Sequence, residues 1–93
     1  MSRPVLVLGT PRPNPARRGE EITLDFVLPA ESDVTLALYN TAGQRIAVRA
    51  KDRLSAGTQQ ITWRPASRWA GPFFMRLVTG TGRSGSARVV IVP

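Results

Sequence analysis

Apolar and polar residues alternate with a period of two along most of the chain, which is typical of β-strands with one face on a core. The clearest case is residues 20–28, which end before Pro29. One face carries Ile22, Leu24, Phe26 and Leu28, and the other carries Glu21, Thr23 and Asp25. No stretch of ten or more residues has the spacing of an amphipathic helix. The pattern therefore predicts strands over residues 4–8, 20–28, 33–40, 44–51, 57–64, 72–79 and 85–92.

The segment Asn40-Thr41-Ala42-Gly43 predicts a hairpin turn, in which Gly43 takes a positive φ. Its return strand alternates, so we expect one apolar face and one basic, solvent-exposed face. The expected inward residues are Ile46, Val48 and Ala50, and the expected basic stripe is Arg45, Arg49 and Lys51. Two interpretations of the stripe are open, because basic residues either protect an edge strand from pairing or bind an anion.

Residues 54–57 are predicted to form a loop, followed by a strand with Ile61 and Trp63 on one face and Trp63 in the core. Pro65 interrupts the next segment, so residues 64–71 are expected to connect the two sheets. Trp69 lies in this connection. It either stacks on a sugar or a base, or it caps the open end of the core.

The last strand, residues 87–92, is almost entirely aliphatic, and Arg88 is its only charge. With seven short strands, no helix and no Cys, the chain is expected to be an all-β, seven-stranded immunoglobulin-like Greek-key β-sandwich without a disulfide. Its 93 residues suit a single domain, in which residues 1–15 form an N-terminal strand and a proline-rich lead-in.

The charge is strongly basic, with 13 Lys and Arg against 6 Asp and Glu and a net charge of +7. All the acidic residues lie at or before Asp52, and residues 53–93 carry only arginines among the charged types. Such a chain attracts polyanions. The arginines indicate either a selected basic surface or the codon usage of a GC-rich genome.

The residue types available argue against catalysis. The chain has no Cys and no His, so it lacks a thiolate nucleophile, the usual triad base and the common transition-metal ligands. Its serines have no Ser-x-x-Lys arrangement, and the glycines at 80 and 82 join two strands rather than a strand to a helix. The acidic residues are too dispersed for calcium. We expect no enzyme activity, no catalytic residue, no metal and no cofactor.

Short motifs follow one another in a recognisable order from Leu8 to Pro93. They are Pro13-Asn14-Pro15, Leu28-Pro29, Val34-x-Leu36-x-Leu38-Tyr39-Asn40-x-x-Gly43-Gln44-Arg45, Leu54-x-x-Gly57, Trp63, Gly71-x-Phe73-Phe74-x-Arg76-Leu77 and Arg88-Val89-Val90-Ile91-Val92. As an ordered set they resemble the C-terminal sorting domain of proteins exported by the type IX secretion system, a family similar to the Ig-like domain of the flagellar hook-capping protein. Phe73 stands where that family usually has Tyr, and Pro93 follows a reduced basic cluster.

The resemblance implies a non-catalytic C-terminal module of a larger secreted protein, exported through the periplasm and outer membrane of a Gram-negative-type bacterium to its surface. The implied partners are the outer-membrane secretion machinery and an N-terminal cargo domain. The implied sorting-signal residues are Gly71, Phe73, Arg76, Leu77, Arg88, Val89, Val90, Ile91 and Val92. An aliphatic terminal strand with one charge is suited to recognition by strand addition.

Two other functions remain open. The chain could be a structural immunoglobulin-like spacer or assembly module, and an exposed apolar edge would permit strand-mediated self-association. It could also be an accessory module that binds an anionic glycan or lipopolysaccharide, whereas nucleic acid is not expected. The candidate binding residues are Arg45, Arg49, Lys51, Trp69 and Phe74.

Overall fold

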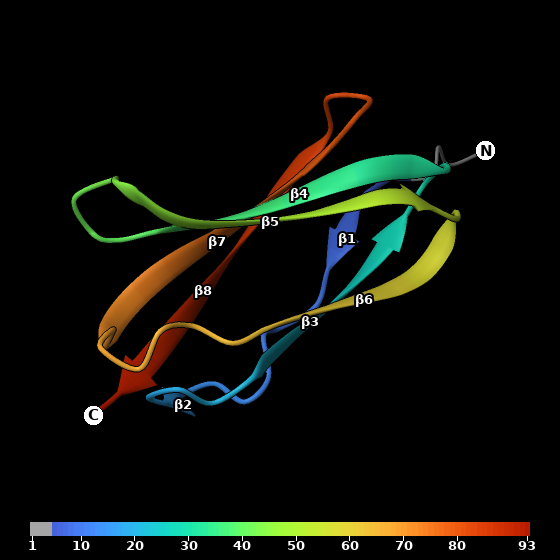
Figure 1. Ribbon diagram of the computed structural model, residues 1–93. Helices are drawn as coiled ribbons and strands as arrows, with labels where there is room; N and C mark the ends of the chain where they lie inside the picture. Colours follow the sequence, from blue (N-terminus) through green and yellow to red (C-terminus); the bar gives the residue numbers. More distant parts are fainter. Residues whose placement is uncertain (1–4) are drawn as a thin grey trace.

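The computed structural model describes residues 5–93, in which eight strands form two facing sheets (Figure 1). The strands are β1 (Val7–Leu8), β2 (Ala16–Arg17), β3 (Ile22–Leu28), β4 (Ser32–Tyr39), β5 (Arg45–Leu54), β6 (Gly57–Trp63), β7 (Gly71–Thr79) and β8 (Ser84–Val92). These residues include no helix, and hence no helix that could cross a membrane. The predicted all-β fold is confirmed.

A three-stranded sheet, in the order β1-β3-β6, faces a five-stranded sheet in the order β2-β8-β7-β4-β5. Neighbouring strands are antiparallel except β2, which runs parallel to β8 near the C-terminal end (Figure 1). The predicted two-sheet sandwich is therefore present. Strand β2 was not predicted, because the proline-rich segment around it has no alternation. The immunoglobulin-like topology stays a prediction.

The ends of two predicted strands differ from the structure. Pairing at the first strand is limited to Val7–Leu8, and Pro4 lies outside the described residues. The loop predicted at 54–57 is present but shorter, residues 55–56, because β5 continues to Leu54 and β6 begins at Gly57. A bulge explains the longer β5. Ser32 and Val34 of β4 lie opposite Leu54 and Lys51, so β5 carries one extra residue there.

Other predicted local features are confirmed. Gly43 has a φ of 80° and its N–H donates to the Asn40 carbonyl at 3.0 Å, which closes the predicted hairpin turn. The Asn40 side chain accepts from the backbone N–H groups of Ala42 and Gln44, each at 3.0 Å. On β6, Ile61 is buried and Trp63 packs partly buried against the core, as expected for one face.

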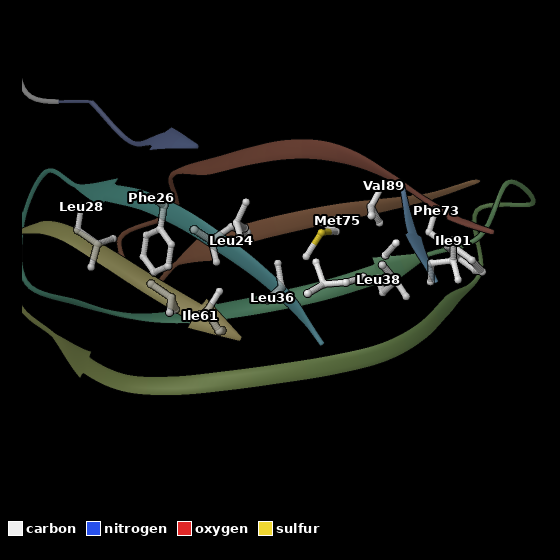
Figure 2. Packing of buried hydrophobic residues seen from close by; sticks show 14 residues of the cluster. Leu24, Phe26, Leu28, Leu36, Leu38, Ile61, Phe73, Met75, Val89 and Ile91 are labelled. Atoms are coloured by element: carbon white, nitrogen blue, oxygen red, sulfur yellow. The ribbon is translucent and has the colours of Figure 1, made fainter. Parts of the chain in front are cut away.

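The core lies between the two sheets (Figure 2). The predicted inward residues of β3 face apolar side chains from β4, β7 and β8, and their alternation explains why these strands form. The buried core residues are Ala16, Ile22, Leu24, Phe26, Leu28, Val34, Leu36, Leu38, Ile61, Phe73, Met75, Leu77, Val89 and Ile91. Burial of this apolar surface stabilises the sandwich without a disulfide.

Candidate functional site

The two segments that carry the expected sorting residues lie side by side. Strands β7 and β8 pair antiparallel, with Gly71 opposite Ile91 and Phe73 opposite Val89. Gly71 has a φ of 117°, in the region that favours glycine, at the point where the 64–70 connection enters β7.

These sorting residues divide between the two faces of the sheet. The buried members, which hold the core together, are Phe73, Leu77, Val89 and Ile91. The members on the outer face are Arg76 and Arg88, which are exposed, and Val90 and Val92, which are half-buried. This second group, together with the half-buried Gly71, is accessible to another molecule while the sandwich stays folded.

The outer edge of β8 is covered along part of its length. Val90 N–H donates to Asn14 Oδ1 at 3.1 Å, and Asn14 Nδ2 donates to the Arg88 carbonyl at 3.0 Å. Beyond them, β2 pairs with Ile91 and Val92. Strand addition along residues 88–92 is therefore blocked in this conformation, because the Asn14 side chain and β2 occupy the edge.

The rest of this edge is open. Because the Val90 N–H points away from β7, the twofold period of a strand turns the backbone groups of Ser84 and Ser86 outward as well. Residues 84–87 pair with β7 on one side, but within residues 5–93 no strand pairs with the edge of β8 that faces away from β7 there. The open edge, residues 84–87, is the accessible hydrogen-bonding edge next to the expected signal.

The predicted basic stripe on β5 is wrong as a single face. Leu38 lies opposite Ala47, whereas Tyr39 lies opposite Arg45, so Ile46 is an extra residue in β5. This register shift reverses the faces that follow it. Val48 is opposite Ala37 on the outer face and is 48% exposed, not inward as expected.

Arg49 and Lys51 consequently lie on the core side of the sheet, opposite Leu36 and Val34. Both are exposed, because β5 is the outermost strand and the facing sheet is narrower. Arg49 lines a cavity of about 10 Å³ together with Trp63. Of the three expected basic residues, Arg45 alone belongs to the outer face.

Trp69 caps the core, which was one of its two predicted roles. Its ring centroid lies 6.4 Å from that of Trp63, and the side chain packs partly buried against the core cluster. The Arg68 guanidinium lies over the Trp69 ring, 5.1 Å from its centroid. Arg68 thus occupies space over the indole that a stacking ligand would need.

Phe74 lies on the outer face of the five-stranded sheet, in a row that crosses four strands. Phe74 is opposite both Arg88 of β8 and Tyr39 of β4, and Tyr39 is opposite Arg45 of β5. Directly paired residues share a face. We call Arg88, Phe74, Tyr39 and Arg45 the outer row. Phe74 is 43% exposed and Tyr39 is half-buried beside it.

The next row contains Ser86, Arg76, Ala37 and Val48. Ala37 is only 5% exposed although it does not belong to the core cluster, so its neighbours on the outer face cover it. Sequence reasoning placed Phe74 and Arg45 in one candidate binding surface, together with residues that lie elsewhere, and missed Tyr39 and the row. The register of the hairpin at residues 40–43 places Tyr39 opposite Arg45. The extra residue at Ile46 shifts the faces of the strand after that pair, so the alternation of β5 does not reveal this register.

The cavities are small. The cavity beside Arg49 and Trp63 lies between the sheets, and a groove of about 180 Å³ over β1 and β3 is lined by residues that include Val7, Val27 and Asp25. Both are below the roughly 300 Å³ at which small-molecule pockets begin. In the part of the chain that is described, no three acidic residues gather as a metal-binding group.

No protein-family model matches the chain, and the search of curated proteins finds no match either.

Proposed function

We propose that the chain is a non-catalytic C-terminal sorting and anchoring domain, which directs a larger secreted protein across the outer membrane to the cell surface by type IX secretion. The proposal rests on the resemblance described above. In this proposal, the outer-membrane machinery recognises and binds the terminal strand, and the rest of the sandwich holds that strand in place.

The observation that carries the proposal is the β7–β8 hairpin at the edge of the five-stranded sheet. It joins the two segments of the resemblance and leaves the edge of residues 84–87 that faces away from β7 without a strand neighbour. An open strand edge can accept an added strand from a partner through backbone hydrogen bonds. Arg88 and Val90 stand on the adjoining outer face, where they could confer specificity on such pairing.

The test is export of a reporter fused to the N-terminal side of this domain, in a host that has type IX machinery. Deleting residues 88–93 also removes Val89 and Ile91 from the core, so point variants are needed beside the deletion. Arg88→Gln and Val90→Ser change only outer-face side chains. We expect the deletion and the combined point variant to leave the reporter in the periplasm.

Two controls separate recognition from folding and charge. Leu24→Ala weakens the core on β3 and leaves β7 and β8 unchanged. Arg49→Gln removes the same charge as Arg88→Gln from the core side of β5. Both controls should be exported when the cells are grown below the melting temperature of Leu24→Ala. The proposed sorting function is wrong if two proteins are exported as efficiently as the unchanged domain. These are the combined Arg88→Gln and Val90→Ser variant and the deletion of residues 88–93.

Export of both the deletion and the combined point variant would support a structural spacer, in which the same strands only bury the core. A known type IX sorting domain, exported in parallel, establishes that the host machinery works.

A further inference from the structure

The outer face of the five-stranded sheet combines exposed aromatic, aliphatic and basic side chains. Across the outer row, Phe74 and Tyr39 lie on adjacent strands with Arg88 and Arg45 at the two ends. Four neighbouring strands place these ends roughly 14 Å apart, from a strand spacing of about 4.8 Å. Arg76 adds a third guanidinium in the next row.

The charge of this face is not balanced locally. Strands β7 and β8 contain no acidic residue, and the acidic residues of β4 and β5 are Asp33 and Asp52 at the far end of these strands. Along β4, Tyr39 is six residues from Asp33, which is roughly 20 Å. The ion pair present among residues 5–93 joins Arg12 to Asp25, both of which lie outside this sheet. The outer row is therefore complementary to an anion.

We propose that the outer row, together with Arg76, binds an acidic polysaccharide through its carboxylates. The flat ring of Phe74 suits the apolar C–H face of a sugar ring, while the flanking guanidinium groups can each hold a carboxylate by paired hydrogen bonds. Hydroxyl groups of Tyr39 and Ser86 lie on the same face and can bond sugar hydroxyls.

The number of exposed rings favours sugar over single-stranded nucleic acid. Sites for single strands stack successive bases on several aromatic side chains. On the described outer face, Phe74 is strongly exposed, whereas Tyr39 is half-buried. Such a surface offers one good stacking position beside several cations. This binding site is independent of the sorting function, since it needs no secretion machinery.

The test is titration of the isotope-labelled chain with an oligogalacturonate at low salt, followed by backbone NMR shifts and by calorimetry. Phe74→Ala and Arg45→Gln are the test variants, because neither residue belongs to the expected sorting signal. Arg49→Gln is the matched control, since it removes the same charge from the same strand on the opposite face. Amide spectra of each variant establish that the fold is kept.

We expect shifts centred on Phe74, Tyr39 and Arg45, and Kd values that rise at least about fivefold for each test variant. Arg49→Gln should stay within about twofold, and the methyl-esterified, uncharged oligomer should not bind. Three results would overturn the proposal: no binding of oligogalacturonate at low salt, equal weakening by Arg49→Gln, or tighter binding of oligo(dT) than of the acidic sugar. Either result on reporter export leaves this binding experiment unaffected.

Discussion

The side-chain amide of Asn14 forms a hydrogen bond with the backbone of Val90, although the two residues lie 76 positions apart in the sequence. Its oxygen accepts the Val90 N–H at 3.1 Å and its nitrogen donates to the Arg88 carbonyl at 3.0 Å. One side chain thus satisfies two backbone groups that a neighbouring strand would otherwise satisfy. It lies just ahead of β2, where Ala16 is fully buried.

Replacing Asn14 with Ala should open this edge without removing any apolar contact of the core. We expect faster amide hydrogen exchange at Val90, by about fivefold to tenfold, because a net hydrogen bond contributes about 1 kcal/mol. Asn14→Asp retains the acceptor for Val90 and should protect that amide better than Ala does. Equal exchange at Val90 in all three proteins would contradict this role.

The register of β5 predicts different costs for two truncations that the sequence alone treats as alike. Leu36→Ala, inside the core, should lower the free energy of unfolding by about 2–5 kcal/mol. Val48→Ala should cost less than about 1 kcal/mol, because Val48 is on the outer face. Chemical denaturation measures both. A cost for Val48→Ala as large as that for Leu36→Ala would contradict the bulge at Ile46.

Asp33 supports the second bulge of β5. Its Oδ1 accepts the Arg53 N–H at 2.8 Å, and Arg53 has a φ of 48°. Asp33→Ala should therefore destabilise the protein by about 1–2 kcal/mol, because a hydrogen bond to a charged group contributes roughly 1.5–3 kcal/mol and the exposure of Asp33 to solvent reduces this. Asp33→Asn, which keeps an acceptor oxygen, should lose less.

Thermal unfolding of these two Asp33 variants and of Glu31→Ala provides the measurement. Glu31 is an exposed acid two residues earlier that forms no hydrogen bond or ion pair among the described residues. Equal melting temperatures for Asp33→Ala and Glu31→Ala would show that the bond to Arg53 does not matter.

Gly85 allows β1 to approach β8. A Cβ at this position would lie 2.6 Å from Leu8 Cδ1, so Gly85→Ala must displace the Leu8 side chain. We expect a loss of about 1 kcal/mol, because the end of a leucine can move. In a Leu8→Ala background the same change should cost less, and a double-mutant cycle measures this coupling. Additive costs would rule out the contact.

The sequence predicts the inward and outward faces of a strand only where apolar and polar residues alternate without ambiguity. On β3, the polar residues Thr23 and Asp25 alternate with apolar ones, so one assignment of faces is possible and the structure agrees. On β5, Ala47 and Val48 are both apolar, and a bulge at Ile46 exchanges their faces without changing the composition. Such a shift depends on pairing with β4, which local pattern does not encode.

The same reasoning applies to the candidate surfaces. Phe74 and Arg45 could be named because an aromatic or basic residue at an outward strand position is visible in the sequence. Their common row with Tyr39 follows from the registers of three strand pairs, which are tertiary information. Asn14 and β2 contact the edge of β8, although their partners there lie more than seventy residues away in the sequence. No periodicity connects these segments.

The positions of the aromatic side chains give the protein two separate optical reporters. Its two indoles, Trp63 and Trp69, form the pair that packs against the core, whereas its one phenol, Tyr39, is on the outer face. Indole emission should thus follow loosening of the sandwich interior. Tyrosine absorbance should respond when a molecule settles over Phe74, so folding and ligand occupancy can be followed in one unlabelled sample.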